Sequence, residues 1–168
     1  STHPVKYQQL PSNISLQAHK SQMNEFEIPG FMVKTQRLNH PDGGSAYCLM
    51  AEGKKVAYVT DNELNSPDIK NTTWQQWLAF IADADILIHD AQYTEADLPL
   101  KLGWGHSTFN EVARLACEAK VKSLYIISHD PARSDDELLY QEQNLQAEYK
   151  NKLNIYCARE GTVVDLTK

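Results

Sequence analysis

The stretch Ser123–Asp130 reads SLYIISHD. Its middle is apolar and does not alternate with polar residues, which predicts a β-strand covered on both faces. His129 follows directly, so a titratable side chain stands where the strand ends. The same arrangement recurs along the chain, and it decides both the expected fold and the expected site.

Further strands and helices flank this stretch. Strand patterns are found at 13–17, 31–38, 46–51, 55–60, 85–89, 154–158 and 162–166, and the remainder of 1–29 reads as loop. Glu52-Gly53-Lys54 separates two of these runs and predicts a β-hairpin. Thr73, Ser107 and Ser134 are expected to cap three helices. The expected class is α/β, a sheet with helices packed on it.

Length and composition exclude several classes of function. The chain has 168 residues, the size of one ordinary domain. Sixteen basic and 22 acidic residues give a net charge of −6, which argues against a broad nucleic-acid surface. No apolar run approaches the ~20 residues of a membrane span, so we expect no membrane partner. Cys48, Cys117 and Cys157 lie in apolar contexts, as reduced thiols of a cytoplasmic protein do.

Four predicted strands run into titratable residues. These residues are His40, Asp61, Asp90 and His129. Ligands of open α/β sheets bind at the carboxyl ends of strands, so we expect the four side chains to share one rim. Imidazole nitrogen and carboxylate oxygen suit zinc, manganese or iron. His40, Asp61 and His129 are therefore candidate metal ligands, although their spacing matches no local metal motif.

His106 lies in Gly103-Trp104-Gly105-His106-Ser107-Thr108, directly before a predicted helix. A capping role explains the serine but not two glycines around a tryptophan and a histidine. Glycines permit a tight turn, and a helix start favours a nearby anion. We expect His106 to contact a phosphate or to donate a proton to a leaving group. Trp104 is expected to form a wall of the site, with Ser107 as a second substrate-binding residue.

These residues resemble the metallo-β-lactamase fold, and most closely its phosphodiesterase branch, which holds the tRNA 3′-processing endonucleases and the phosphoribosyl cyclic phosphodiesterases. Four segments carry the resemblance in the family's order: 38–47, 59–63, 89–93 together with 105–108, and 127–131. Each motif is short, but the ordered set is specific. The resemblance covers the chain from about Phe31 to its end.

The resemblance implies an αββα sandwich and a metal-dependent hydrolase. Two zinc ions, or manganese or iron, would hold a hydroxide and polarise a phosphodiester. Asp61 would bridge the metals, and His40 and His129 would bind one each. His106, oriented by Asp90, would assist the leaving group. The substrate would be a small-molecule or nucleotide phosphodiester.

The chain also departs from the family. The hallmark His-x-His-x-Asp-His is absent, and neither His3 nor His19 has that pattern. Residues 1–168 are therefore expected to be the C-terminal portion of one domain, with an incomplete sandwich and ligands for about one metal. The other portion would be cleaved, disordered or supplied by another chain, and a homodimer is left open. Ala46 stands where glycine is usual, and Asp90 where the endonucleases have glutamate.

Two alternatives follow from this departure. One is a catalytically inactive or one-metal binding or sensing module of the same fold. The other is a thioester or lactone hydrolase on the same metal site, which the Gly-His-Ser-Thr segment disfavours because its histidine suits phosphate better. His89, inside a strand, is expected to be structural, and His3 and His19 to be solvated.

Overall fold

The computed structural model describes residues 25–166. The predicted strand at 13–17 and the predicted solvation of His3 and His19 lie outside these residues. The described chain forms one seven-stranded sheet whose strand order equals the chain order. Its strands are β1 (Glu25–Ile28), β2 (Phe31–Arg37), β3 (Ser45–Ala51), β4 (Lys54–Val59), β5 (Ile86–Asp90), β6 (Ser123–Ile127) and β7 (Asn154–Cys157). Strands β1 to β4 pair antiparallel, whereas β4 to β7 pair parallel.

Four helices connect or follow the strands: α1 (Trp74–Ile81), α2 (Leu98–Lys101), α3 (Phe109–Glu118) and α4 (Asp135–Glu148). The three longer ones begin with reciprocal capping boxes, which satisfy backbone N–H groups that a helix start leaves free. Thr73 and Ser134 are the caps of α1 and α4, as predicted. The prediction for Ser107 is wrong by one residue, because Thr108 caps α3 and accepts from the Glu111 N–H.

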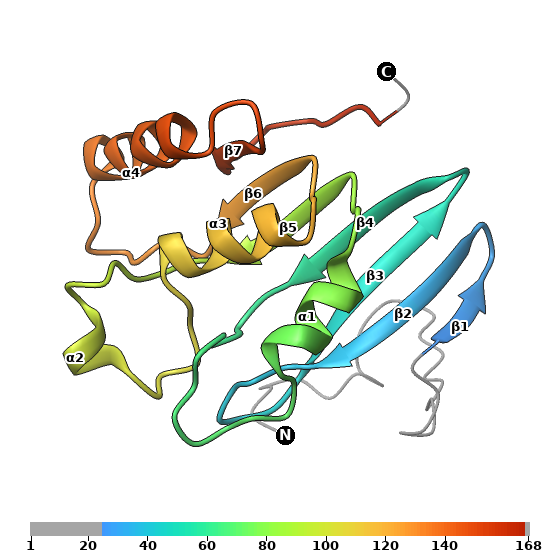
Figure 1. The fold of residues 1–168 in the computed structure, drawn as a ribbon, viewed down its shortest axis with the longest axis horizontal. Helices are drawn as coiled ribbons and strands as arrows, with labels where there is room; N and C mark the ends of the chain where they lie inside the picture. Colours follow the sequence, from blue (N-terminus) through green and yellow to red (C-terminus); the bar gives the residue numbers. More distant parts are fainter. Residues whose placement is uncertain (1–24, 167–168) are drawn as a thin grey trace, which may run out of the picture.

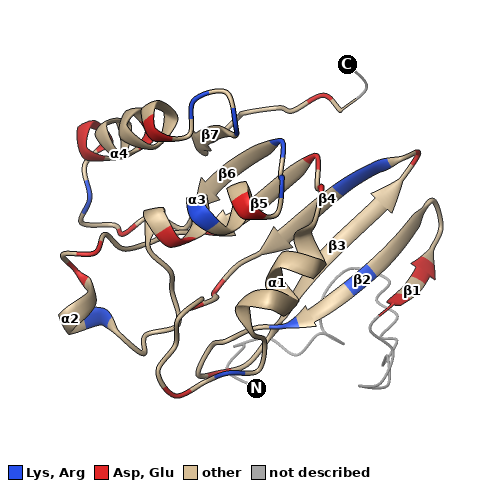
Figure 2. Ribbon diagram, viewed as in Figure 1, with Lys and Arg blue, Asp and Glu red and all other residues tan. Residues whose placement is uncertain are grey.

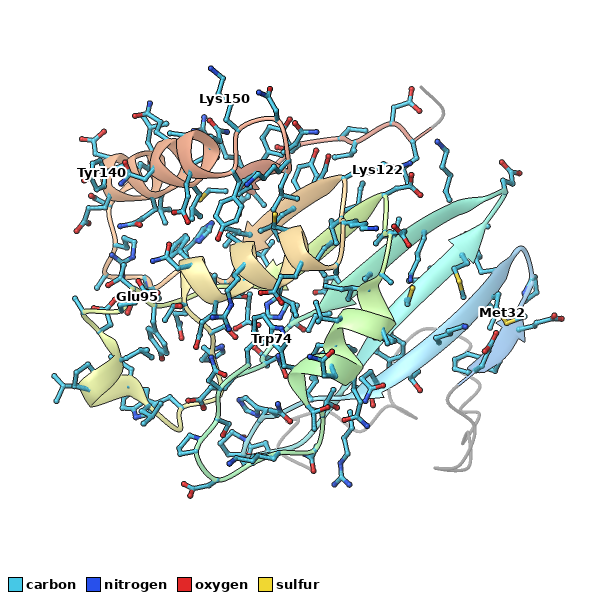
Figure 3. The ribbon with its side chains drawn as sticks, viewed as in Figure 1. Met32, Trp74, Glu95, Lys122, Tyr140 and Lys150 are labelled. Atoms are coloured by element: carbon cyan, nitrogen blue, oxygen red, sulfur yellow. The ribbon has the colours of Figure 1, made fainter. Side chains whose placement is uncertain are left out.

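Helices α1, α3 and α4 cover one face of the sheet, with α1 and α3 in front of it in Figure 1. Alternate residues of adjacent strands point to the same face, and one such row runs through Ala57, Leu87, Leu124 and Ile155 into the hydrophobic core. Trp77 of α1 is fully buried there and belongs to this core. Trp74, labelled in Figure 3, lies between α1 and α3 and donates to Glu118 Oε2 at 2.8 Å.

The opposite face of the sheet carries a row of aromatic side chains. The register aligns Tyr47, Tyr58, Ile88, Tyr125 and Tyr156 across five strands. Three of these tyrosines are 40–44% exposed, and the rings of Tyr125 and Tyr156 stack at 5.0 Å. The prediction that the 123–128 strand is covered on both faces is therefore wrong for the described residues, because only its helix-side face is buried. We call this tyrosine row the open face.

The other strand predictions have mixed outcomes. The strands expected at 31–38, 46–51, 55–60, 85–89 and 154–158 are confirmed within one residue at most ends, as is the hairpin. The strand expected at 162–166 is wrong: the chain turns at Glu160-Gly161, joins no strand of the described part, and leaves Val163 90% exposed. Strand β1 lies in the stretch predicted to be loop, and the sequence pattern does not predict the single turn of α2. None of the helices formed by residues 25–166 combines the length and apolar character needed to cross a bilayer.

Candidate functional site

Strand direction brings the predicted site residues to one edge. Strand β3 is antiparallel to both β2 and β4, so β2 runs the same way as β4, β5 and β6. The carboxyl ends of these four strands therefore share an edge, as predicted. His40, Asp61 and His129 follow β2, β4 and β6, and Asp90 is the last residue of β5.

Asp90 and His106 form a hydrogen-bonded pair at this edge. His106 Nδ1 donates to Asp90 Oδ2 at 2.9 Å, and Asp90 is completely buried. The hydrogen bond that His106 donates to the Asp90 carboxylate raises the pKa of His106 despite partial burial. Burial opposes the charge of Asp90, but hydrogen bonds from His106 and His89 hold its pKa below the usual value. The pair thus favours a protonated imidazole whose Nε2 is left for another partner.

Asp61 lies beside this pair. Its carboxylate is 58% exposed, with Oδ1 4.0 Å from His106 Nδ1. Its backbone is left-handed, with φ of +57°, which is uncommon for a residue other than glycine. Ser128, directly before His129, has the same conformation at the end of β6. Both strands therefore turn sharply just where they present a candidate ligand.

His129 has two ring nitrogens that are buried and have no hydrogen-bond partner among the described residues. Its ring stacks on Phe109, with centroids 6.0 Å apart and nearly parallel planes. Burial and the nearby Arg133 lower the pKa of His129, which favours the neutral imidazole that binds metals. The residue also lines a cavity of about 600 Å³ together with Leu138 and Arg159.

His40 lies beside His106 through its contacts with the 103–106 turn. Its ring lies edge-on to His106, with centroids 5.9 Å apart. Its Nδ1 accepts the Asp42 backbone N–H at 3.2 Å. A Cβ built on Gly105 would lie 2.2 Å from its Cδ2, so the glycine backbone rests directly against the imidazole.

The donors at this edge fit a divalent metal in chemistry but do not complete a site. No three His, Cys, Asp or Glu side chains within residues 25–166 come together as a metal-binding group. The unpartnered nitrogens of the neutral His129 and the exposed carboxylate of Asp61 are nevertheless ligands that zinc accepts. The chain therefore offers metal donors at the edge while leaving coordination positions open.

The two predicted substrate-binding residues are placed differently. Trp104 is 58% exposed beside the site, with Lys101 Nζ 4.4 Å above its ring. Ser107 is completely buried: its hydroxyl donates to the Asn62 carbonyl at 2.6 Å and accepts the Leu64 N–H at 3.1 Å. Trp104 is thus accessible to a ligand, whereas Ser107 joins two loops.

Two residues that sequence reasoning did not assign also contact the pair. Asn62 donates its backbone N–H to Asp90 Oδ1 at 3.1 Å, and Tyr93 packs edge-on against His106 at 5.9 Å. His89 is completely buried and its Nδ1 lies 2.7 Å from the Asp90 carbonyl oxygen, in keeping with the structural role expected for it. The sequence shows that Asn62 follows the candidate ligand Asp61, but it does not show that Asn62 is buried.

Comparison with known proteins agrees with this arrangement. No family model matches the chain. Ribonuclease Z of Brevibacillus brevis is 32% identical over 96 residues, which cover 57% of this chain and 27% of the relative. The metallo-β-lactamase fold protein YhfI of Bacillus subtilis superposes with a TM-score of 0.63 at 19% identity, over 84% of this chain and 52% of that one. The short form of human tRNase Z gives a TM-score of 0.58 at 20% identity, over 85% and 46%.

The chain therefore has the metallo-β-lactamase fold, as the sequence motifs predicted. Within that fold its sequence is similar to ribonuclease Z, and the chain spans 27–31% of the length of the first relatives it matches.

Proposed function

We propose that this chain carries half of the active site of a metal-dependent phosphodiesterase. The observation that carries the proposal is the buried Asp90–His106 pair, held at 2.9 Å beside Asp61 on the edge where four strand ends meet. A carboxylate that fixes one imidazole nitrogen leaves the other free to act on a substrate. The ribonuclease Z relatives cleave nucleic acid, and phosphodiester cleavage is the chemistry shared with that branch.

In this proposal the chain's own residues bind, orient and transfer a proton. Asp61, His129 and His40 contribute ligands to divalent metal, which we take to be zinc, two ions per complete site. Bound zinc supplies Lewis acidity and an activated water. His106, protonated and oriented by Asp90, gives its Nε2 proton to the departing oxygen or steadies the phosphate. Trp104 forms an exposed wall against which a base or sugar can pack.

We further propose that the open face packs against a second β-layer of the same domain. The 40–44% exposure of Tyr47, Tyr58 and Tyr156 on a face that no described helix covers supports this, as does the 46–52% coverage of the structural neighbours. That layer would carry the remaining metal ligands and would come from the same gene or from another chain. A cytoplasmic location suits the three free cysteines.

The test is hydrolysis by the longest natural reading frame that contains this chain, loaded with zinc or manganese. Substrates would be an activated phosphodiester, cyclic nucleotides, an RNA with a 3′ extension and a lactone. Cleavage of any diester that is lost in His106→Ala supports the proposal. Failure on every diester, or a preference for the lactone, contradicts it.

A binding or sensing module is the second candidate. The absence of a preassembled metal group within residues 25–166 favours it. Metal analysis distinguishes the phosphodiesterase from the module. A full-length protein that holds well under one metal ion per chain and shows no turnover would support the module.

A further inference from the structure

Glu63 is a buried carboxylate with no role in the proposed chemistry. It is 3% exposed and comes two residues after Asp61, at the start of the loop that leaves β4. A buried carboxylate is costly unless hydrogen bonds satisfy it. The hydrogen-bond partners of Glu63 therefore indicate which part of the structure this carboxylate stabilises.

Both oxygens of Glu63 bind backbone across the site. Oε1 accepts the Gly103 N–H at 2.8 Å, and Oε2 accepts the Gly105 N–H at 3.1 Å. The two N–H groups flank Trp104, so one carboxylate clamps both ends of the turn that leads into His106. Both glycines are left-handed, with φ of +84° and +92°, a turn that needs an external acceptor for its amides.

The backbone of Glu63 is fixed to the loop that carries His40. Its N–H donates to the Asn39 carbonyl at 3.1 Å, and its own carbonyl accepts the Ser66 N–H at 3.3 Å. The clamped Gly105 in turn rests on the His40 ring, where an added Cβ would come within 2.8 Å of Nε2. Glu63 thus lies between the two histidine-bearing loops and is hydrogen-bonded to the backbone of both.

We infer that Glu63 is a positioning residue, which sets the 103–105 turn so that His106 meets Asp90 and Gly105 stays against His40. The effect of Glu63 on catalysis rests on the proposed function. The two hydrogen bonds from the Gly103 and Gly105 amides to Glu63 do not depend on it. Glu63 acts through backbone amides, so its loss displaces His106 without removing a group that contacts substrate.

The experiment compares wild type with Glu63→Gln and Glu63→Ala in the full-length protein. Glutamine keeps the shape and one acceptor oxygen, whereas alanine removes both acceptors. Glu111→Gln is the matched control, because Glu111 is a carboxylate in the first turn of α3 that accepts the Thr108 N–H and not an amide of the 103–105 turn. The readouts are the amide exchange rates and proton shifts of Gly103 and Gly105, the His106 ring resonances, and kcat and KM on an activated phosphodiester.

We expect Glu63→Gln to unprotect one glycine amide and Glu63→Ala both, with the His106 ring resonances shifting in each. kcat should fall about tenfold or more, as for other residues that orient site groups, with KM changed less. Unchanged amides and ring resonances in folded Glu63→Gln overturn the inference. Unprotected amides in a protein that cleaves no diester leave the clamp standing and refute the proposed function instead. A fall in stability with the His106 resonances and kcat unmoved shows a merely structural role.

Discussion

Asp90 shares its two carboxylate oxygens between His106 and the loop that follows β4. Oδ2 accepts His106 Nδ1 at 2.9 Å, while Oδ1 accepts the Asn62 N–H at 3.1 Å. The same buried group therefore orients the candidate acid and fixes the loop beginning at Asp61. A change at Asp90 should act on both.

Asp90→Asn should reduce turnover about 10- to 100-fold, the usual cost of losing a group that orients a site histidine. The amide keeps the size of the side chain but removes the charge that favours protonated His106. Steady-state kinetics of the full-length, metal-loaded protein would measure this. Asp68→Asn, at an exposed loop carboxylate, is the control. Equal activity of both variants would refute the role of Asp90.

Gly105→Ala and Gly103→Ala form a matched pair. Both positions have positive φ, so alanine costs backbone strain of about 1–3 kcal/mol at either. Only at Gly105 would the new Cβ strike another side chain, 2.2 Å from His40 Cδ2. We expect both variants to lower stability, and Gly105→Ala to lower activity more than Gly103→Ala does. Thermal unfolding and diesterase assays on the two proteins check this, and identical losses would exclude a specific contact with His40.

Ser107→Ala tests whether this residue meets substrate. Its hydroxyl is buried between Asn62 and Leu64, so removal should leave the Leu64 N–H unsatisfied. The expected effect is a loss of about 1–3 kcal/mol in the free energy of unfolding. The KM of Ser107→Ala should stay within about twofold of the wild-type value, because the buried hydroxyl is out of reach of a ligand. A large rise in KM with unchanged stability would restore Ser107 as a substrate-binding residue.

Stability should depend on pH through Asp85. The hydrogen bond from Lys122, labelled in Figure 3, at 2.7 Å and that from the Lys55 N–H at 2.8 Å lower the Asp85 pKa against the opposing effect of burial. The folded-state pKa lies below the unfolded one, so the stabilisation is complete above the ordinary aspartate pKa of about 3.9 and is lost as pH falls through the folded-state value.

Asp85→Asn should therefore cost roughly 1 kcal/mol at pH 7, a modest figure because Lys122 is 70% exposed and solvent screens the pair. The difference from wild type should shrink toward zero in strong acid. Denaturant unfolding at pH 7 and at pH 3 and below measures it, with the exposed neighbour Asp83→Asn as control. A constant difference across this range would show that the charge of Asp85 is not responsible.

Charge placement also bears on the substrate. Figure 2 shows basic residues spread over elements from β2 to the loop before β7, with an acidic first turn on α4. We therefore expect the described residues to attract a long polyanion only weakly. Raising the salt concentration from 50 to 200 mM should change KM for a small diester less than about threefold, whereas a protein with many phosphate contacts loses far more. A steep salt dependence would indicate a nucleic-acid substrate bound elsewhere on the protein.

The sequence was most informative where one local signal determined the structure. Apolar runs identified β5 and β6, and the residues at their ends marked the edge that gathers Asp90 and His129. Capping boxes fixed the starts of α1 and α4. Ser107 was misassigned because serine and threonine are both good caps, although the sequence places Thr108 and Glu111 at the spacing of a capping box.

Other features depend on contacts that are distant in sequence. Glu63 is polar and follows a candidate ligand, so nothing local distinguishes it from a solvated loop residue. Its burial arises only when the Gly103–Gly105 turn folds over it. The strand expected at 162–166 failed for the converse reason: its residues have a β pattern but no partner strand in the described part of the chain.

The sequential order of the strands has a consequence for folding. Because each strand of the sheet pairs with its neighbours in the chain, the sheet can grow by adding one strand at a time, without threading a late segment between earlier ones. The edge that holds His40, Asp61, Asp90 and His129 would then be completed progressively, with β6 contributing last. A nascent chain would gain its full set of candidate ligands only as this late strand docks.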